Sequence, residues 1–255
     1  MAAPRYKSHL LGKFPRVEDI VTFRFERPPG YHYRAGQWLV ITFQGPDGPL
    51  DHHFSHSSSP TEPWVEFTTR LRDSEFKSAL VELEPGAEVE IEAPFGSFVL
   101  EPGADPVAFL AGGIGITCVR SILKACVDEL ADHAERAGPA EPADPAGPAE
   151  PRRRPMTLIF ANRSEDGIPF REELAEMESK LPSFRVVHVL SRAGEQWTGR
   201  RGHISADILD RELPRSPRRT YYVSGPPAFA SAMQDLLAAQ GVDPDRVTAE
   251  RFEGY

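Results

Sequence analysis

The first hundred residues alternate short apolar segments with turn signals. This pattern predicts strands at Ile20–Glu26, Trp38–Phe43, Trp64–Leu71, Ala87–Ala93 and Ser97–Leu100. Pro-Pro-Gly at 28–30, Gly-Pro-Asp-Gly at 45–48 and Pro-Gly at 85–86 separate them. One helix interrupts the strands, with Ser74 as N-cap and Phe76, Leu80 and Leu83 on one face. Short strands at this spacing predict a small antiparallel β-barrel.

After Pro102-Gly103 the pattern changes to strand, turn, helix, strand. We predict strands at Val107–Ala111, Thr157–Ala161, Arg185–Leu190, Thr220–Val223 and Val247–Phe252, and helices at about 118–130, 170–180, 204–211 and 228–240. Repeated βαβ units indicate a doubly wound parallel sheet in an α/β domain. The chain is therefore expected to have two domains, residues 1–102 and 103–255.

Residues 131–155 differ from the rest of the second domain. They repeat Gly-Pro-Ala, Glu-Pro-Ala and Asp-Pro-Ala triplets and end in a run of arginines. Such a composition cannot bury a core, so we expect a disordered insertion between a helix and a strand.

Charge and cysteine content exclude several classes of function. The 255 residues carry a formal net charge of -9, which gives no reason to expect a nucleic-acid partner. The two cysteines, Cys118 and Cys126, are too few for a four-thiolate iron–sulfur cluster and poorly placed for a disulfide scaffold or a zinc site. No apolar run approaches the roughly 20 residues that span a bilayer, and the start does not resemble a signal peptide, so we expect a cytoplasmic location.

A glycine-rich turn follows the first strand of the second domain. In FLAGGIGITC, residues 109–118, a buried strand runs into Gly112, Gly113 and Gly115 and then into a helix. Glycines there let backbone N–H groups and a helix N-terminus approach a pyrophosphate, which suits a dinucleotide. A tight βα connection without a ligand is the alternative.

The carboxyl ends of the other parallel strands belong to the same expected site. Asn162-Arg163 stands where an acidic ribose ligand is usual, and Arg192 follows the next strand. Two arginines at adjacent strand ends can bind the adenosine phosphate of NADPH, whereas solvated loop residues are the alternative. The expected dinucleotide-binding residues are Gly112, Gly113, Gly115, Thr117, Arg163, Ser191, Arg192, Ser224, Gly225 and Pro226.

A second signal is DHHFSHSSSP, residues 51–60, at the end of a barrel strand. Its histidine, aromatic ring and hydroxyl can meet a phosphate or ribityl oxygen, the face of a flat ring and a ring nitrogen. Taken alone, the segment favours a Phe54 that fills the barrel, followed by a polar turn.

Four motifs together resemble the ferredoxin-NADP reductase superfamily. They are HHFS at 52–55, SEFKSALVELEPGAEVEIEAPFGSF at 74–98, AGGIGIT at 111–117 and YVSGPP at 222–227. The resemblance is collinear over nearly the whole chain apart from 131–155. It implies a flavin-binding barrel and a nicotinamide-binding α/β domain, with the flavin, usually FAD, between them.

The resemblance also assigns flavin-binding residues, with one departure. The family's usual motif is Arg-x-Tyr/Phe-Ser/Thr, and His52 replaces its arginine while Phe54 and Ser55 match, a pattern closer to the ferric reductase and NADPH oxidase branch. Phe54 is then expected to pack on the isoalloxazine and Ser55 to reach N5, with Arg70 and Lys77 supplying positive charge. The expected set is His52, His53, Phe54, Ser55, Thr69, Arg70, Phe76 and Lys77.

On the nicotinamide side the chain departs from its relatives twice. Cys118 replaces a proline and is expected to be a small packing residue, and Ser224 takes a position where many relatives have cysteine. The final Tyr255 resembles the terminal tyrosine that stacks on the flavin in plant-type members, with a frayed terminus as the alternative. The residues expected at the reaction centre are Ser55, Thr117, Ser224 and Tyr255.

The resemblance implies an FAD-dependent NAD(P)H oxidoreductase that passes electrons to a separate acceptor. Ferredoxin, an oxygenase component, ferric chelates and quinones are the candidate acceptors, and Arg163 and Arg192 favour NADPH over NADH. Two alternatives stay open. One is a flavin-binding regulatory or electron-transfer subunit that is inactive alone, and the other is a scaffold without a cofactor.

Overall fold

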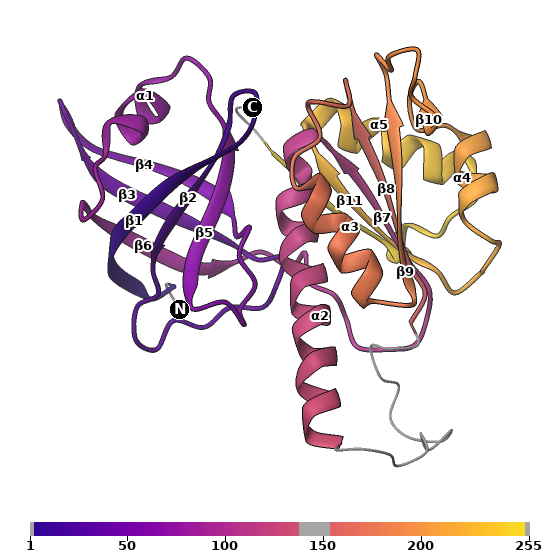
Figure 1. The fold of residues 1–255 in the computed structure, drawn as a ribbon, viewed down its shortest axis with the longest axis horizontal. Coiled ribbons are helices and arrows are strands. Elements are labelled where there is room, and N and C mark those ends of the chain that lie inside the picture. The colour runs from indigo at the N-terminus through magenta and orange to yellow at the C-terminus, as the bar shows by residue number, and fades with distance from the viewer. Residues whose placement is uncertain (1–2, 138–153, 253–255) are drawn as a thin grey trace.

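The computed structural model describes residues 3–137 and 154–252 and places two β-sheets side by side (Figure 1). The first sheet contains β1 (Arg5–Val17), β2 (Ile20–Glu26), β3 (Trp38–Gly45), β4 (Gly48–Ser55), β5 (Trp64–Arg70) and β6 (Glu88–Phe95). The second contains β7 (Val107–Gly112), β8 (Met156–Asn162), β9 (Phe184–Leu190), β10 (Arg200–Arg201), β11 (Thr220–Gly225) and β12 (Val247–Arg251). None of the helices within the described ranges is both long and apolar enough to cross a membrane.

The first sheet curls into a barrel. Its antiparallel order is β4-β3-β6-β1-β2-β5, and a bridge from His56 to Phe67 connects the chain just after β4 with β5. Apolar residues on alternate positions fill the interior, including Phe23, Phe25 and Phe67. Helix α1 (Glu75–Glu82) covers one end of the barrel, and the Ser74 side chain accepts the N–H of Lys77, as its predicted capping role requires.

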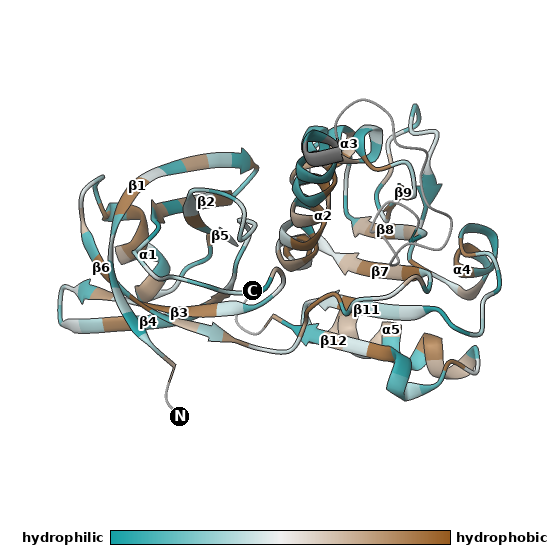
Figure 2. Cartoon of the chain, turned by 90° about the horizontal axis from the view of Figure 1, so that it is seen from below, coloured by the Kyte–Doolittle hydropathy of each residue, from teal (hydrophilic) through white to brown (hydrophobic). Residues whose placement is uncertain are grey.

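The second sheet is parallel throughout, in the order β10-β9-β8-β7-β11-β12. Figure 2 shows α2 (Ile116–Ala137) and α3 (Arg171–Lys180) on one face and α5 (Pro227–Ala239) on the other, with α4 (Ala206–Glu212) beside α5. Separate apolar clusters cover the two faces. The expected barrel followed by a doubly wound parallel sheet is therefore confirmed.

Three local expectations were wrong. Residues 97–100 are not a strand, because Phe98 leaves the barrel and packs edge-on against Tyr222 in the second core. Helix α2 runs over Ile116–Ala137 rather than 118–130, since 131–137 contain no helix breaker before the first Gly-Pro pair. The predicted disordered insertion at 131–155 was wrong for 131–137, which belong to α2, and its part at 138–153 lies outside the described residues.

Two long strands were missed. Strand β1 contains Gly12 and Pro15, and its pairing with β2 shifts register beside both residues. Strand β4 begins with Gly-Pro and carries three charged or histidine residues. Glycine, proline and charge within a segment weaken the strand pattern on which the sequence prediction relied.

Candidate functional site

The glycine turn lies where the strand order of the parallel sheet reverses. From β7 the chain builds outward through β8 and β9, and then returns to place β11 on the other side of β7. The 3-10 turn η1 (Gly113–Gly115) follows β7 directly and leads into α2. This reversal point, at the carboxyl ends of the strands, is the usual ligand site of such sheets.

Close packing explains two of the glycines. A Cβ on Gly115 would lie 2.3 Å from the carbonyl oxygen of Ser224, and one on Gly112 would lie 2.8 Å from the Phe229 ring. Gly113 instead has a φ of +52° and open space where a Cβ would be. Gly115 therefore permits contact between two strand ends, and Gly113 leaves the turn open on its outer side.

Two of the hydroxyls expected at the reaction centre, those of Thr117 and Ser224, are buried in the turn. Ser224 Oγ donates to the Gly115 carbonyl at 2.8 Å, and Thr117 Oγ1 donates to the Ile114 carbonyl at 3.2 Å. Thr117 and Ser224 are at most 1% exposed. In this structure both hydroxyls hold the shape of the turn.

A cleft of about 250 Å³ separates the barrel from the ends of the parallel strands. Glu18, Arg70 and Arg72 line its barrel side. Its other side includes five predicted dinucleotide residues, Gly112, Gly113, Arg163, Ser191 and Pro226. The structure thus brings residues of both predicted sites to one opening.

The two predicted arginines lie at neighbouring strand ends. The backbone N–H of Arg192 donates to the Arg163 carbonyl at 2.7 Å, and both side chains are exposed. Their positions fit a phosphate that reaches the rim of the cleft. Beside them, Asn162 lines the cleft with a buried Nδ2 that lacks a hydrogen-bond partner among the described residues. A ligand can accept a hydrogen bond from this amide. The position of Asn162 at the end of a parallel strand is the sequence feature that could have identified it as a binding residue.

Phe54 lies inside the barrel. It is 1% exposed, and its ring is stacked on Phe67 with centroids 4.1 Å apart. Thr69 and Phe76 are also buried in the barrel. Phe54 therefore fills the barrel, as the segment alone favoured, and its ring presents no face to the cleft, where the family resemblance had placed it.

His52 is partly covered by neighbouring rings. Its ring lies 4.8 Å from that of Phe54, and Nδ1 is 2.9 Å from the His53 carbonyl oxygen. Burial lowers the pKa of His52, so the imidazole is neutral at pH 7. The adjacent His53 is exposed, and Ser55 is 5% exposed. His52 thus does not replace the permanent charge of the family's arginine.

Positive charge gathers at the same end of the barrel. Arg70 pairs with Asp19 and with Glu18, the latter at 3.3 Å. Lys77 is 2% exposed, and burial together with the charge of Arg72 lowers its pKa. These side chains are the phosphate-binding candidates on the barrel side, as predicted for Arg70 and Lys77.

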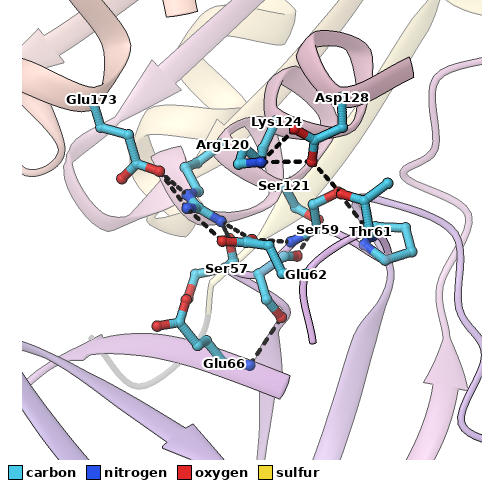
Figure 3. Close-up of polar contacts among 12 residues, drawn as sticks. Ser57, Ser59, Thr61, Glu62, Glu66, Arg120, Ser121, Lys124, Asp128 and Glu173 are labelled. Carbon is cyan, nitrogen blue, oxygen red and sulfur yellow. Dashed lines mark hydrogen bonds and ion pairs between the residues drawn. The ribbon is translucent and has the colours of Figure 1, made fainter. Parts of the chain in front are cut away.

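A buried ionic network joins the two domains and was not predicted (Figure 3). Arg120 on α2 donates to the Ser57 carbonyl at 2.8 Å and pairs with the carboxylates of Glu62 and Glu173. Ser57 and Glu62 belong to the barrel, and Glu173 lies on α3. This network, the Arg120 network, fixes the barrel against the helices that begin at the cleft. The partners are 53 to 63 residues from Arg120, so no local pattern could reveal them.

Two further acidic or thiol groups lie near the reversal point. Glu250 of β12 is paired in register with Ser224, and burial raises its pKa to about 7. Cys118 is fully buried, where burial raises the pKa of its thiol. Tyr255, the predicted stacking residue, lies outside the described residues.

Known proteins resemble this chain along its length. The oxidoreductase NAD-binding domain model matches residues 109–235. Ferredoxin–NADP reductase B of Sorangium cellulosum is 29% identical over 98% of this chain and 99% of its own length. NADH-cytochrome b5 reductase 1 of Mortierella alpina is 30% identical over 90% of this chain and 68% of its own.

Other matches are longer than this chain or more distant. The chain spans 60% of the glycine betaine monooxygenase reductase subunit of Pseudomonas aeruginosa, at 27% identity over 92% of the chain. Among solved structures, a ferredoxin NADP+ reductase from Neisseria gonorrhoeae with bound FAD and NADP has a TM-score of 0.77 and 20% identity. It is matched over 98% of this chain and 99% of its own. That likeness establishes the fold.

Proposed function

The chain belongs to the ferredoxin-NADP reductase superfamily, and on this basis we propose that it oxidises NAD(P)H through bound FAD and passes the electrons to a separate acceptor. The observation that carries the proposal is the cleft between the domains. It has the glycine turn and Arg163 on one side and Arg70 and Arg72 on the other. Both halves of a two-cofactor site therefore open to the same space.

The nucleotide side of the cleft fits a dinucleotide. The turn at Gly113 has space for a pyrophosphate next to the start of a 22-residue helix, whose N-terminal dipole favours negative charge. Arg163 and Arg192 are placed to hold the adenosine phosphate of NADPH, and Asn162 offers its unsatisfied amide. We assign these residues to binding and orientation of the dinucleotide.

The barrel side fits the phosphates of a flavin better than it fits a stacked ring on Phe54. Arg70 and Arg72 line the cleft, and we assign to them and to the neighbouring Lys77 the charge that His52 lacks. When bound, FAD accepts hydride from NAD(P)H and releases electrons singly or in pairs. The chain's own contribution is to hold the two cofactors in a fixed position relative to each other. The Arg120 network and the turn that Ser224 and Thr117 stabilise provide this.

The acceptor is a separate molecule. A ferredoxin or an oxygenase component as acceptor is consistent with the names of the relatives. We also propose small acceptors such as ferric chelates or quinones. We also propose a cytoplasmic location, because the two cysteines are free thiols, the state that a reducing compartment maintains.

The test is direct. Protein purified with or without added FAD should show flavin absorbance, and it should reduce ferricyanide at the expense of NADPH or NADH. Initial rates with the two dinucleotides at equal concentration decide between them.

One observation favours a second candidate, a scaffold that does not bind flavin. Phe54 is enclosed in the barrel and His52 is neutral, so two residues of the expected flavin motif do not make their expected contacts. Failure to retain FAD after reconstitution would support the scaffold and reject the oxidoreductase. Retention of FAD without ferricyanide reduction would instead support a subunit that is inactive alone.

A further inference from the structure

A pocket lies at the edge of the parallel sheet opposite the cleft. It measures about 360 Å³ and includes Val107, Met156 and Phe184, the first residues of β7, β8 and β9. The six residues of β7 separate this edge from the cleft by roughly 20 Å. The amino-edge pocket, as we call it, is thus a different place from the proposed dinucleotide site.

The polar lining of the amino-edge pocket is basic. Arg185, Arg215 and Arg219 line it, and none of its described lining residues is Asp or Glu. Arg185 is paired with Glu212 at 2.9 Å, which leaves Arg215 and Arg219 without a carboxylate partner in the described structure. In a chain with a net charge of -9, this is a local excess of positive charge.

Arg219 is buried, and no carboxylate within the described residues pairs with it. It is 6% exposed, as buried as Arg120 at 5% and Arg154 at 6%. Arg120 pairs with two carboxylates, and Arg154 donates to two backbone carbonyls. Arg219 donates to the Pro214 carbonyl at 2.7 Å, and its Nε–H has no acceptor among the described residues. A buried charge is costly unless it is paired, so this arginine needs an anion.

A second unsatisfied donor lies in the same pocket. The hydroxyl of Ser183 is buried and has no partner within the described ranges. Four prolines, Pro106, Pro155, Pro182 and Pro214, form much of the rim and restrict its backbone. The pocket therefore has a rigid rim around a guanidinium Nε–H and a hydroxyl that both lack an acceptor among the described residues.

The neighbouring space gives room for more than one anionic group. A cavity of about 570 Å³ shares Arg215, Ser216 and Arg219 with the amino-edge pocket and adds Arg246. Asp210 and Asp243 line its far part, which limits how much negative charge it can take. The favoured place for a single oxyanion is therefore the amino-edge pocket.

We propose that the amino-edge pocket binds a phosphate or carboxylate group of a small molecule, held by Arg219, Arg215 and Ser183. The anion supplies the counter-charge of Arg219 and an acceptor for the Ser183 hydroxyl. This site is independent of the oxidoreductase activity proposed above, because it shares no residue with the cleft.

Thermal unfolding and calorimetric titration with inorganic phosphate test the proposal. The protein should carry Arg163→Ala and Arg192→Ala and be saturated with FAD, so that neither side of the cleft dominates phosphate binding. Ionic strength should be held constant with KCl. We expect a saturable rise in Tm that fits a single site. Pyrophosphate and citrate, titrated in the same way, distinguish phosphate from carboxylate ligands. If phosphate raises the Tm no further than KCl does, the proposal is wrong.

Variants locate the site. In the same background, Arg215→Ala should weaken phosphate binding at least tenfold. Arg211→Ala removes an equally exposed arginine, which is paired with Asp207 on α4, and should leave binding unchanged. Arg219→Met should raise the Tm in phosphate-free buffer and remove the response to phosphate, because it removes the unpaired charge. Equal binding by Arg215→Ala and Arg211→Ala, or full binding by Arg219→Met, contradicts the proposal.

Discussion

Arg120 Nη2 donates to Glu62 Oε1 at 3.1 Å, and this bond crosses from the α/β domain to the barrel. Arg120 and Glu62 are 5% and 8% exposed, so the pair is shielded from water and salt. The Ser57 carbonyl, two residues beyond Ser55, accepts from the same guanidinium. Arg120 therefore helps to set the orientation of the predicted flavin motif relative to α2, together with the bond from Ser121 to the Ser58 carbonyl.

Replacing Arg120 with leucine should lower the free energy of unfolding by about 3 to 5 kcal/mol, because the buried Glu62 and the partly buried Glu173 both lose their partner. Arg120→Lys should recover part of this loss, since an ammonium cannot reach Glu62, Glu173 and the Ser57 carbonyl with the same geometry. Urea unfolding measures both. Lys180→Leu, which breaks an exposed pair with Glu176, is the control and should cost below about 1 kcal/mol. Equal losses for Arg120→Leu and Lys180→Leu would show that the network contributes little.

Local patterns predicted much of the fold. The strand at Ile20–Glu26 and the cap at Ser74 were placed correctly, because alternation and capping are encoded within a few residues. The position of the glycine turn was also predicted correctly, since β7 runs into η1 and then into α2.

Packing between distant segments could not be predicted from the sequence. The pattern could not decide whether Phe54 faces the barrel or the cleft, because both faces of β4 near its end are covered. Nor could it find the Arg120 network, whose acidic partners come from a loop and a distant helix. The direction of a side chain and its hydrogen-bond partners depend on how the two domains pack together. The sequence of a single segment does not determine that packing.

Gly115→Ala should be far more damaging than Gly113→Ala. The first places a Cβ 2.3 Å from backbone of Ser224, where neither strand end can move easily, and should cost roughly 3 kcal/mol. The second places its Cβ in open space. It should lower the unfolding free energy by only about 1 kcal/mol, because alanine is strained in the left-handed backbone conformation. Thermal unfolding and NADPH titration of both variants check this order. A Gly113→Ala variant that is as unstable as Gly115→Ala would contradict the packing described for the reversal point.

Phe54→Leu should behave as a core substitution. Loss of the stacked contact with Phe67 should lower the unfolding free energy by about 1 to 2 kcal/mol, while the dissociation constant for FAD changes less than about threefold. Fluorescence titration with FAD gives the affinity. His53→Leu, on the exposed side of the same strand, controls for a general effect on β4. A tenfold loss of FAD affinity with unchanged stability would restore the stacking role first expected for Phe54.

Arg192→Ala should raise the KM for NADPH about tenfold or more and leave the KM for NADH nearly unchanged. A charge-assisted hydrogen bond to the extra phosphate is worth roughly 1.5 to 3 kcal/mol, and NADH lacks that phosphate. Arg163→Ala should act in the same direction, because the two residues are hydrogen-bonded neighbours. Arg211→Ala, remote from the cleft on α4, should change neither constant. Equal rates of the unmodified protein with NADPH and NADH would refute the role of both arginines.

Glu250→Gln should make the protein more stable at pH 8 and leave it unchanged near pH 4. Burial raises the pKa of Glu250 to about 7 in the folded protein, above its usual value of 4.5. Below the lower value the carboxyl is protonated in both states, and the substitution changes little. As pH rises through 7, the folded protein must hold a buried charge, so stability that was present at acid pH is lost. The shift corresponds to roughly 3 kcal/mol at most, because one pKa unit is worth about 1.4 kcal/mol.

Unfolding in urea at pH 4, 6 and 8 gives the difference between the two proteins. Glu195→Gln, in an exposed loop, should show no comparable pH dependence. If the gain of Glu250→Gln were constant across this range, the carboxyl would not titrate near neutrality.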